Sequence, residues 1–282
     1  MSIANRQREQ NSLEETLGPY DRNHDGAALG PSVHVPEEDQ RSVYPYTISG
    51  SASFADPAES RRRTQMLHTT YLYLSVAVAA AMAGAWFGAH SETYLKVVFG
   101  AGWLFFIPMF LVLNFVPALA LGVAERAPRF AIPALALDGL VSGLALAPLV
   151  FIGLVYSGSD ASGGGNFVST AVVITGAIFA AITAYVHLNK TEFKVSGAVM
   201  WGIFGFAIVC IPVNMFLQSS LLSMIVSGVI GIFGAIQLAM ATSTIVTDPK
   251  FNSPAAGALM LFAGLFNLFQ AILHLLLSGG RD

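Results

Sequence analysis

Seven long apolar segments constrain this chain more than any other feature of its sequence. A helix of roughly 20 apolar residues crosses the hydrocarbon core of a bilayer, and each segment is long enough to do so, allowing for tilt. Charged residues make up 11% of the chain, whereas soluble domains carry roughly 25%. The segments cover residues 67–89, 95–123, 130–156, 167–188, 196–216, 219–246 and 255–278. The sequence therefore predicts an all-α polytopic membrane protein, a seven-transmembrane helix bundle over residues 65–282.

Residues 1–64 differ in composition and predict a polar, mostly irregular N-terminal tail. They are rich in charged residues, Ser, Pro and Gly, and such a segment buries too little apolar surface to offset the entropy of ordering. Within the tail, Asp21, Asn23, Asp25 and the following glycine match the first half of an EF-hand calcium loop. The second half departs from that pattern, because Ser32 stands where a bidentate Glu is required. The motif is therefore a weak calcium-loop candidate or an Asx-type turn.

Basic residues alternate between the two sides of the predicted bundle. Arg61, Arg62 and Arg63 directly precede the first apolar segment, and the other connectors on that side also carry Lys or Arg. Positive connectors usually remain in the cytoplasm. We therefore expect a cytoplasmic N-terminus and a C-terminus across the membrane, with the three arginines as orientation anchors that contact lipid headgroups.

Several functional classes have no support in the sequence. The net charge is −3 and the basic residues are scattered, which argues against a nucleic-acid-binding surface. Cys210 is the single cysteine, so an internal disulfide framework is excluded. Motifs for metal-dependent hydrolysis, nucleophilic catalysis and phosphate binding are lacking. The sequence predicts a protein that is not an enzyme, with no cofactor and no confident metal site.

Small residues predict close helix contacts at two places. Gly84 and Gly88 lie one turn apart, and Gly228, Gly231 and Ala235 share one helix face. Small side chains allow two transmembrane helices to approach closely. Such contacts occur within one bundle or between two copies of the chain, so an oligomer stays possible.

Asp138 is the one acidic residue well inside an apolar segment. A carboxylate at membrane depth is costly, so the residue lies near the interface, is protonated, is paired, or is functional. One hypothesis gives Asp138 a role in cation or proton movement, or in a solute carrier; the other makes it a hydrogen-bonded structural carboxyl. Its candidate partners are Asn114, Asn214, Gln237, Asn267, Gln270 and His274.

The last apolar segment carries a loose polar stripe. Gly264, Asn267 and His274 fall within residues 255–277, which bear no formal charge. A polar stripe in a transmembrane helix normally faces protein or water. Asn267 and His274 are therefore ion-pathway candidates, or they are hydrogen-bonding residues that hold helices together.

Three stretches resemble the Bax inhibitor/YccA family, also described by the transmembrane Bax inhibitor motif. Ala184-Tyr185 is followed by Thr191-Glu192-Phe193, similar to the turn after the family's fourth helix. Residues 143–149 resemble its Gly-Leu-x-Leu-Ser-Pro stretch, and residues 259–269 resemble its closing signature around Asn-Leu-Phe. The resemblance extends over about residues 61–277.

The resemblance implies two functions and marks one departure. Family members carry a pair of aspartates on the last two helices, implicated in a pH-sensitive calcium leak, because neighbouring carboxylates share protons and attract divalent cations. This sequence is a divergent member without that pair, since Ala241 and Gly264 stand at these positions. A regulator or accessory subunit, binding a membrane protease such as FtsH or a larger complex, is therefore favoured over a leak channel. The resemblance also implies a bacterial inner membrane, with membrane lipids as further partners.

Overall fold

The computed structural model describes residues 57–159, 166–217 and 219–279. Within these ranges, seven helical segments are long and apolar enough to cross a membrane, which confirms the predicted fold class. The tail that contains Asp21, Asn23 and Asp25 lies outside the described residues. The α-helices are α2 (Pro57–His90), α3 (Glu92–Ala101), α4 (Phe106–Arg126), α5 (Ala131–Ser159), α6 (Phe167–Asn189), α7 (Gly197–Leu217), α8 (Ser220–Thr247) and α9 (Pro254–Gly279).

The second predicted segment is not one continuous helix, so that part of the prediction is wrong. The chain divides into α3, a 3-10 turn at Gly102–Phe105, and α4. Gly102 has a φ of 54°, and glycine adopts positive φ angles without steric cost. The Ser91 side chain caps the start of α3 by accepting a hydrogen bond from the Tyr94 amide. With 10 residues, α3 is too short to cross a bilayer.

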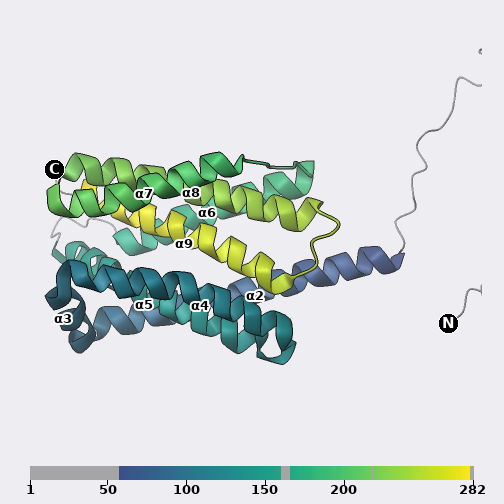
Figure 1. The fold of residues 1–282 in the computed structure, drawn as a ribbon, viewed down its shortest axis with the longest axis horizontal. Helices are drawn as coiled ribbons and strands as arrows, with labels where there is room; N and C mark the ends of the chain where they lie inside the picture. Colours follow the sequence, from purple (N-terminus) through teal and green to yellow (C-terminus); the bar gives the residue numbers. More distant parts are fainter. Residues whose placement is uncertain (1–56, 160–165, 218, 280–282) are drawn as a thin grey trace, which may run out of the picture. The chain divides into compact units, whose positions relative to one another are not determined.

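The helices form two groups that α9 connects (Figure 1). In one group α5 packs against α2 and α4; in the other, α8 packs against α6 and α7. α9 pairs extensively with α8 and also contacts α2, α4, α5 and α6. The closing helix therefore lies between both groups and holds them together.

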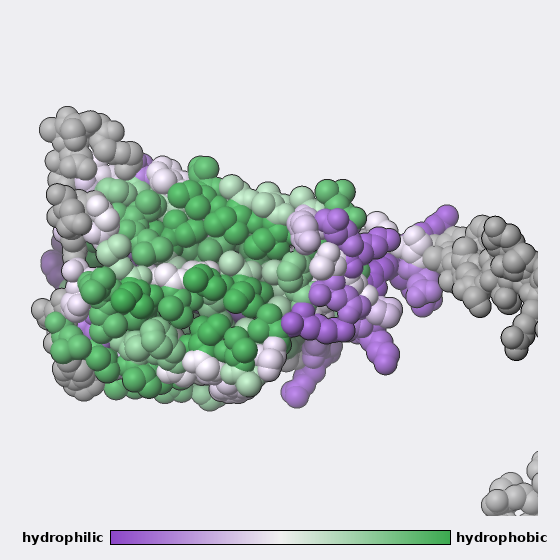
Figure 2. Space-filling view, turned by 90° about the horizontal axis from the view of Figure 1, so that it is seen from above, coloured by the Kyte–Doolittle hydropathy of each residue, from purple (hydrophilic) through white to green (hydrophobic). Residues whose placement is uncertain are grey.

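The outer surface of the helical unit is largely hydrophobic. Figure 2 shows hydrophobic residues over its middle and hydrophilic residues gathered at the end where α2 begins. Phe87, Leu188 and Trp201 are among the large hydrophobic side chains that remain exposed, as expected for a surface in contact with lipid. We call the end where α2 begins, with the connectors α4–α5, α6–α7 and α8–α9, the proximal end. The opposite end is called the distal end.

Glycine contacts bring α2 and α5 together. A Cβ atom added at Gly139 would overlap the Ala77 carbonyl oxygen, and one added at Gly143 would overlap that of Ala81. Gly84 of α2 lies equally close to the Leu140 carbonyl. The predicted contact near Gly84 is therefore present. At the second place, a Cβ atom at Gly231 would lie 3.2 Å from the Cβ atom of Ala271, whereas one at Gly228 would meet no atom within 4 Å.

Candidate functional site

The positions that the resemblance aligns with the paired aspartates lie where α8 crosses α9. Ala241 is 1% exposed and belongs to a hydrophobic cluster with Leu238 and Leu261. A Cβ atom at Gly264 would lie 3.0 Å from the Leu238 amide nitrogen, and one at Gly234 would lie 2.7 Å from the Leu268 amide nitrogen. The two glycines let the helix backbones touch. The space that a carboxylate side chain would need at position 264 is therefore taken by backbone atoms.

Asn267 forms a hydrogen bond between α8 and α9. Its Nδ2 atom donates to Oε1 of Gln237 at 2.8 Å. Of the candidate partners named for Asp138, these two side chains bind each other instead. A hydrogen bond of this kind between transmembrane helices contributes about 0.6 to 1.7 kcal/mol.

His274 lies among serine hydroxyls nearer the distal end of the same two helices. Its Nδ1 atom is 2.9 Å from the Ser227 hydroxyl and 3.4 Å from that of Ser278, and its Nε2 atom is 3.3 Å from the Ser223 hydroxyl. Ser223 and Ser227 were missed in the sequence, although they lie one turn apart on an apolar helix. Both ring nitrogens therefore bind hydroxyl groups, and the imidazole connects α8 to α9.

Asp138 lies apart from these polar groups, on the buried face of α5. Ala131, Leu135, Asp138 and Ser142 follow each other at helical spacing, and all four are buried. Asp138 is 1% exposed, and its Oδ1 atom has no hydrogen-bond partner among the described residues. The structure thus does not bring Asp138 together with Asn267 or His274.

Hydrogen bonds join the connectors at the proximal end. The Arg63 guanidinium donates to the carbonyl oxygens of Ile245, Val246 and Asp248 at the end of α8, where the helix dipole favours a positive charge. Ser253 donates to Glu125 at 3.2 Å, which ties the start of α9 to the end of α4. Arg61 and Arg62 are exposed. Arg63 therefore binds α8 in addition to any role as an anchor.

A second connector is held by Ser243, which is 2% exposed. Its hydroxyl donates to the Thr191 carbonyl at 3.0 Å and accepts from the Phe193 amide at 2.8 Å. The Thr-Glu-Phe turn after α6 is therefore fixed to α8 by one side chain. In the same turn, a hydrogen bond and the charge of Glu192 raise the pKa of Lys194.

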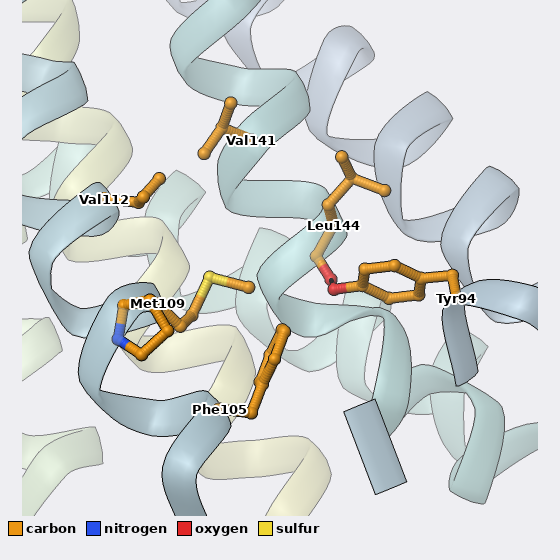
Figure 3. A pocket seen from close by; sticks show the side chains of 7 residues that line it. Tyr94, Phe105, Met109, Val112, Val141 and Leu144 are labelled. Atoms are coloured by element: carbon orange, nitrogen blue, oxygen red, sulfur yellow. Dashed lines mark hydrogen bonds between the residues drawn. The ribbon is translucent and has the colours of Figure 1, made fainter. Parts of the chain in front are cut away.

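An apolar cavity of about 310 Å³ lies where α3 meets α4 and α5. Figure 3 shows the Tyr94 ring at one side of it, beside Leu144. The Tyr94 hydroxyl donates to the Leu144 carbonyl at 2.6 Å, and burial raises the pKa of Tyr94. Pro148 follows Leu144 by four residues and has no amide hydrogen to donate to that carbonyl. Tyr94 thus supplies the hydrogen bond that the proline removes.

Replacing Tyr94 with phenylalanine is expected to lower stability by about 1 to 2 kcal/mol, because the Leu144 carbonyl then loses its partner. In a Pro148→Ala background the amide of residue 148 can take over as donor, so the same replacement should cost less. Denaturation of the four proteins in detergent measures this difference. Equal costs in both backgrounds would show that Tyr94 does not replace the missing amide.

No group of three or more His, Cys, Asp or Glu side chains within the described ranges is placed to hold a metal ion. The candidate site therefore consists of separate parts: the closed α8–α9 crossing, the serine-bound His274, and the isolated carboxyl of Asp138.

Three bacterial proteins are similar in sequence to this chain. A chain from Neisseria meningitidis serogroup A is 24% identical over 245 residues, which are 86% of this chain and 100% of that protein. A Helicobacter pylori protein is 25% identical over 74% of this chain and 84% of its own length. A Campylobacter jejuni protein is 27% identical over 49% of this chain, and the match spans only 57% of that protein. All three are described as uncharacterised.

No solved structure matches the chain significantly. The model of one family, described as "Inhibitor of apoptosis-promoting Bax1", matches residues 63–281. That range includes all the transmembrane helices from Arg63 onward and all parts of the candidate site. The chain belongs to the Bax inhibitor family of membrane proteins.

Proposed function

We propose that this protein is a non-enzymatic regulator or accessory subunit that binds another membrane protein through α7. The observation that carries the proposal is the sparse packing of this helix within its own bundle. α7 packs mainly against α8, and between Gly197 and Asn214 none of the side chains that the structure describes is buried. A transmembrane helix with so few contacts has a face available to a helix of another protein.

Small residues on α7 indicate how such a partner would bind. Ala198, Gly202, Gly205 and Val209 follow each other at helical spacing, and all are exposed. A Cβ atom at Gly202 or Gly205 would meet nothing within 4 Å. Glycine costs about 1 kcal/mol relative to alanine inside a helix, and contacts within this bundle do not account for that cost. A transmembrane helix of a partner that approaches α7 closely would account for the cost of these glycines.

The partner we propose is an integral membrane protein, such as a membrane protease of the FtsH type, in a bacterial inner membrane. The basic residues at the proximal end, including Arg61 and Arg129, support a cytoplasmic location for that end. The polar tail would then lie on the cytoplasmic side, where it adds a second segment for binding.

Site-specific crosslinking tests the proposal. A photoreactive amino acid at position 202 or 205 of the full chain in native membranes should capture one defined membrane protein. The matched control is position 176, because Gly176 of α6 is also exposed and also has no atom within 4 Å of an added Cβ. Lipid adducts alone, or equal capture at position 176, would contradict the proposal. Capture of a second copy of the chain would replace the regulator with a homo-oligomer.

A calcium leak through paired acids is less well supported, because the α8–α9 crossing has no acid at position 241 or 264 and no room at position 264. We expect proteoliposomes that contain the protein to take up calcium no faster than empty vesicles. Uptake that depends on pH and is lost in Asp138→Asn would restore the leak as the function.

A further inference from the structure

Among the residues that the structure describes, Asp138 is the acidic side chain buried within the bundle, and the proposed function does not use it. It is 1% exposed, and its Oδ1 atom has no hydrogen-bond partner among the described residues. Ionised carboxyl groups at such depth are rare unless they are paired, because the charge loses its hydration. A paired structural carboxylate would have a basic or hydrogen-donating neighbour, and the described residues supply none to Oδ1.

On the proximal side of Asp138, the buried face of α5 is apolar. One turn earlier on α5, Leu135 packs in a cluster with Ala124 of α4 and Ala255 of α9, and Tyr73 of α2 packs against that cluster. Tyr73 is thus a titratable side chain at this cluster. Tyr71, also on α2, is half-buried, and its hydroxyl has no hydrogen-bond partner among the described residues. The remaining titratable or charged groups on α5 and on the elements that pack against it are Glu59, Arg61, Arg62, Arg63, His68 and His90 on α2, Glu125 and Arg126 on α4, Arg129 before α5, Tyr156 on α5, Tyr185 and His187 on α6, and His274 on α9.

The same cluster lies between Asp138 and the proximal end of α5. Asp138 follows Ala131 by seven residues, which is about 10 Å at helical rise. Alanines from three helices meet there: Ala124, Ala131 and Ala255. Directly beyond them, Glu125 accepts a hydrogen bond from Ser253 at the proximal end. Leu135 and these alanines thus lie between the buried carboxyl and a polar pair at the proximal end.

We infer that Asp138 is a proton-binding site inside the bundle, filled and emptied from the proximal end through the junction of α4, α5 and α9. The bound form is the neutral carboxylic acid, and release gives a carboxylate and a proton that passes to water near Glu125. A calcium ion is a poor fit, since it requires six to eight oxygen ligands, and no group of three or more His, Cys, Asp or Glu side chains in the described part of the chain is placed to hold a metal ion. The site is independent of positions 241 and 264.

Infrared difference spectroscopy on the full chain in lipid nanodiscs tests this inference. A carbonyl band of a neutral carboxylic acid is expected at neutral pH, shifting in D₂O and disappearing as the pH rises. Asp138→Asn should abolish the band, whereas Asp248→Asn should keep it, because Asp248 is an exposed residue at the end of α8. Labelling aspartate with ¹³C should shift the band in the unmodified chain. This measurement assigns the band to aspartate even if the Asp138→Asn variant is unstable.

Two results would overturn the inference. The first is a spectrum without an aspartate-dependent neutral band at neutral pH, since Asp138 would then be ionised throughout. The second is loss of the band when sodium or calcium replaces choline at constant pH, since the site would then bind a metal cation. An unchanged band on that replacement supports proton binding. None of these results depends on whether α7 binds a partner.

Discussion

Gly143→Ala is expected to destabilise the bundle by about 3 kcal/mol or more, at the upper end of what an overpacked core costs. The added methyl group would overlap the Ala81 carbonyl oxygen, which belongs to the backbone of α2 and has no rotamer that could relieve the overlap. Gly139 stands in the same relation to Ala77, so the two helices would have to separate over more than one turn. Denaturation in detergent, followed by the loss of monodisperse protein, measures the effect.

The matched control for this prediction is Gly176→Ala in α6. Position 176 is exposed and has no atom within 4 Å of an added Cβ. Alanine is about 1 kcal/mol more favourable than glycine inside a helix, so this variant should be as stable as the wild type or slightly more stable. Similar stability of the variants at positions 143 and 176 would show that α2 and α5 are not held by glycine contact.

Placing aspartates at positions 241 and 264 together is expected to split the α8–α9 pair without producing calcium flux. An unpaired carboxylate near the centre of a transmembrane helix costs about 3 kcal/mol. At position 264 a steric cost adds to this, because the Cβ atom would lie 3.0 Å from the Leu238 amide nitrogen and 3.2 Å from the Gly234 carbonyl oxygen. The yield of folded protein and calcium uptake by proteoliposomes are the measurements.

The variant Gly264→Ala separates the steric cost of the double aspartate variant from its charge cost, since alanine adds a side chain at position 264 but no charge. We expect its loss of stability to be clearly smaller than that of the double aspartate variant. A stable double variant with pH-dependent calcium uptake would show that the α8–α9 crossing can open to accept the family's acid pair. The absence of acids at these positions would then be the only relevant difference between this chain and the family members that carry the acid pair.

The transmembrane helices could be predicted because length and apolar composition decide whether a segment crosses a bilayer. The break between α3 and α4 could not, because only the backbone conformation of Gly102 marks it, within an apolar run. Which helices pack against each other could not be predicted from the sequence either. The role of Gly143 depends on Ala81, and nothing near either residue indicates the other.

For the candidate site, the types of residue could be predicted from the sequence, but their partners seldom could. Asn267 was expected to bind between helices or to face an ion pathway, and the structure pairs it with Gln237. The hydrogen bond from Tyr94 to Leu144 was missed, although Pro148 marks the carbonyl that needs a donor. The burial of Asp138 was one of several alternatives, because the depth of a residue along a helix does not determine which way its side chain faces.

The position of α9 between both helix groups affects how the protein is made. α9 is the last helix in the chain, yet it supplies contacts to α2, α5 and α8. Helices emerge from the ribosome in sequence order, so α2 and α5 can pair early, whereas α8 waits for its neighbour. Until α9 has been inserted, the membrane therefore holds two half-bundles without a common core, and a membrane chaperone or protease would meet the chain in this unfinished form.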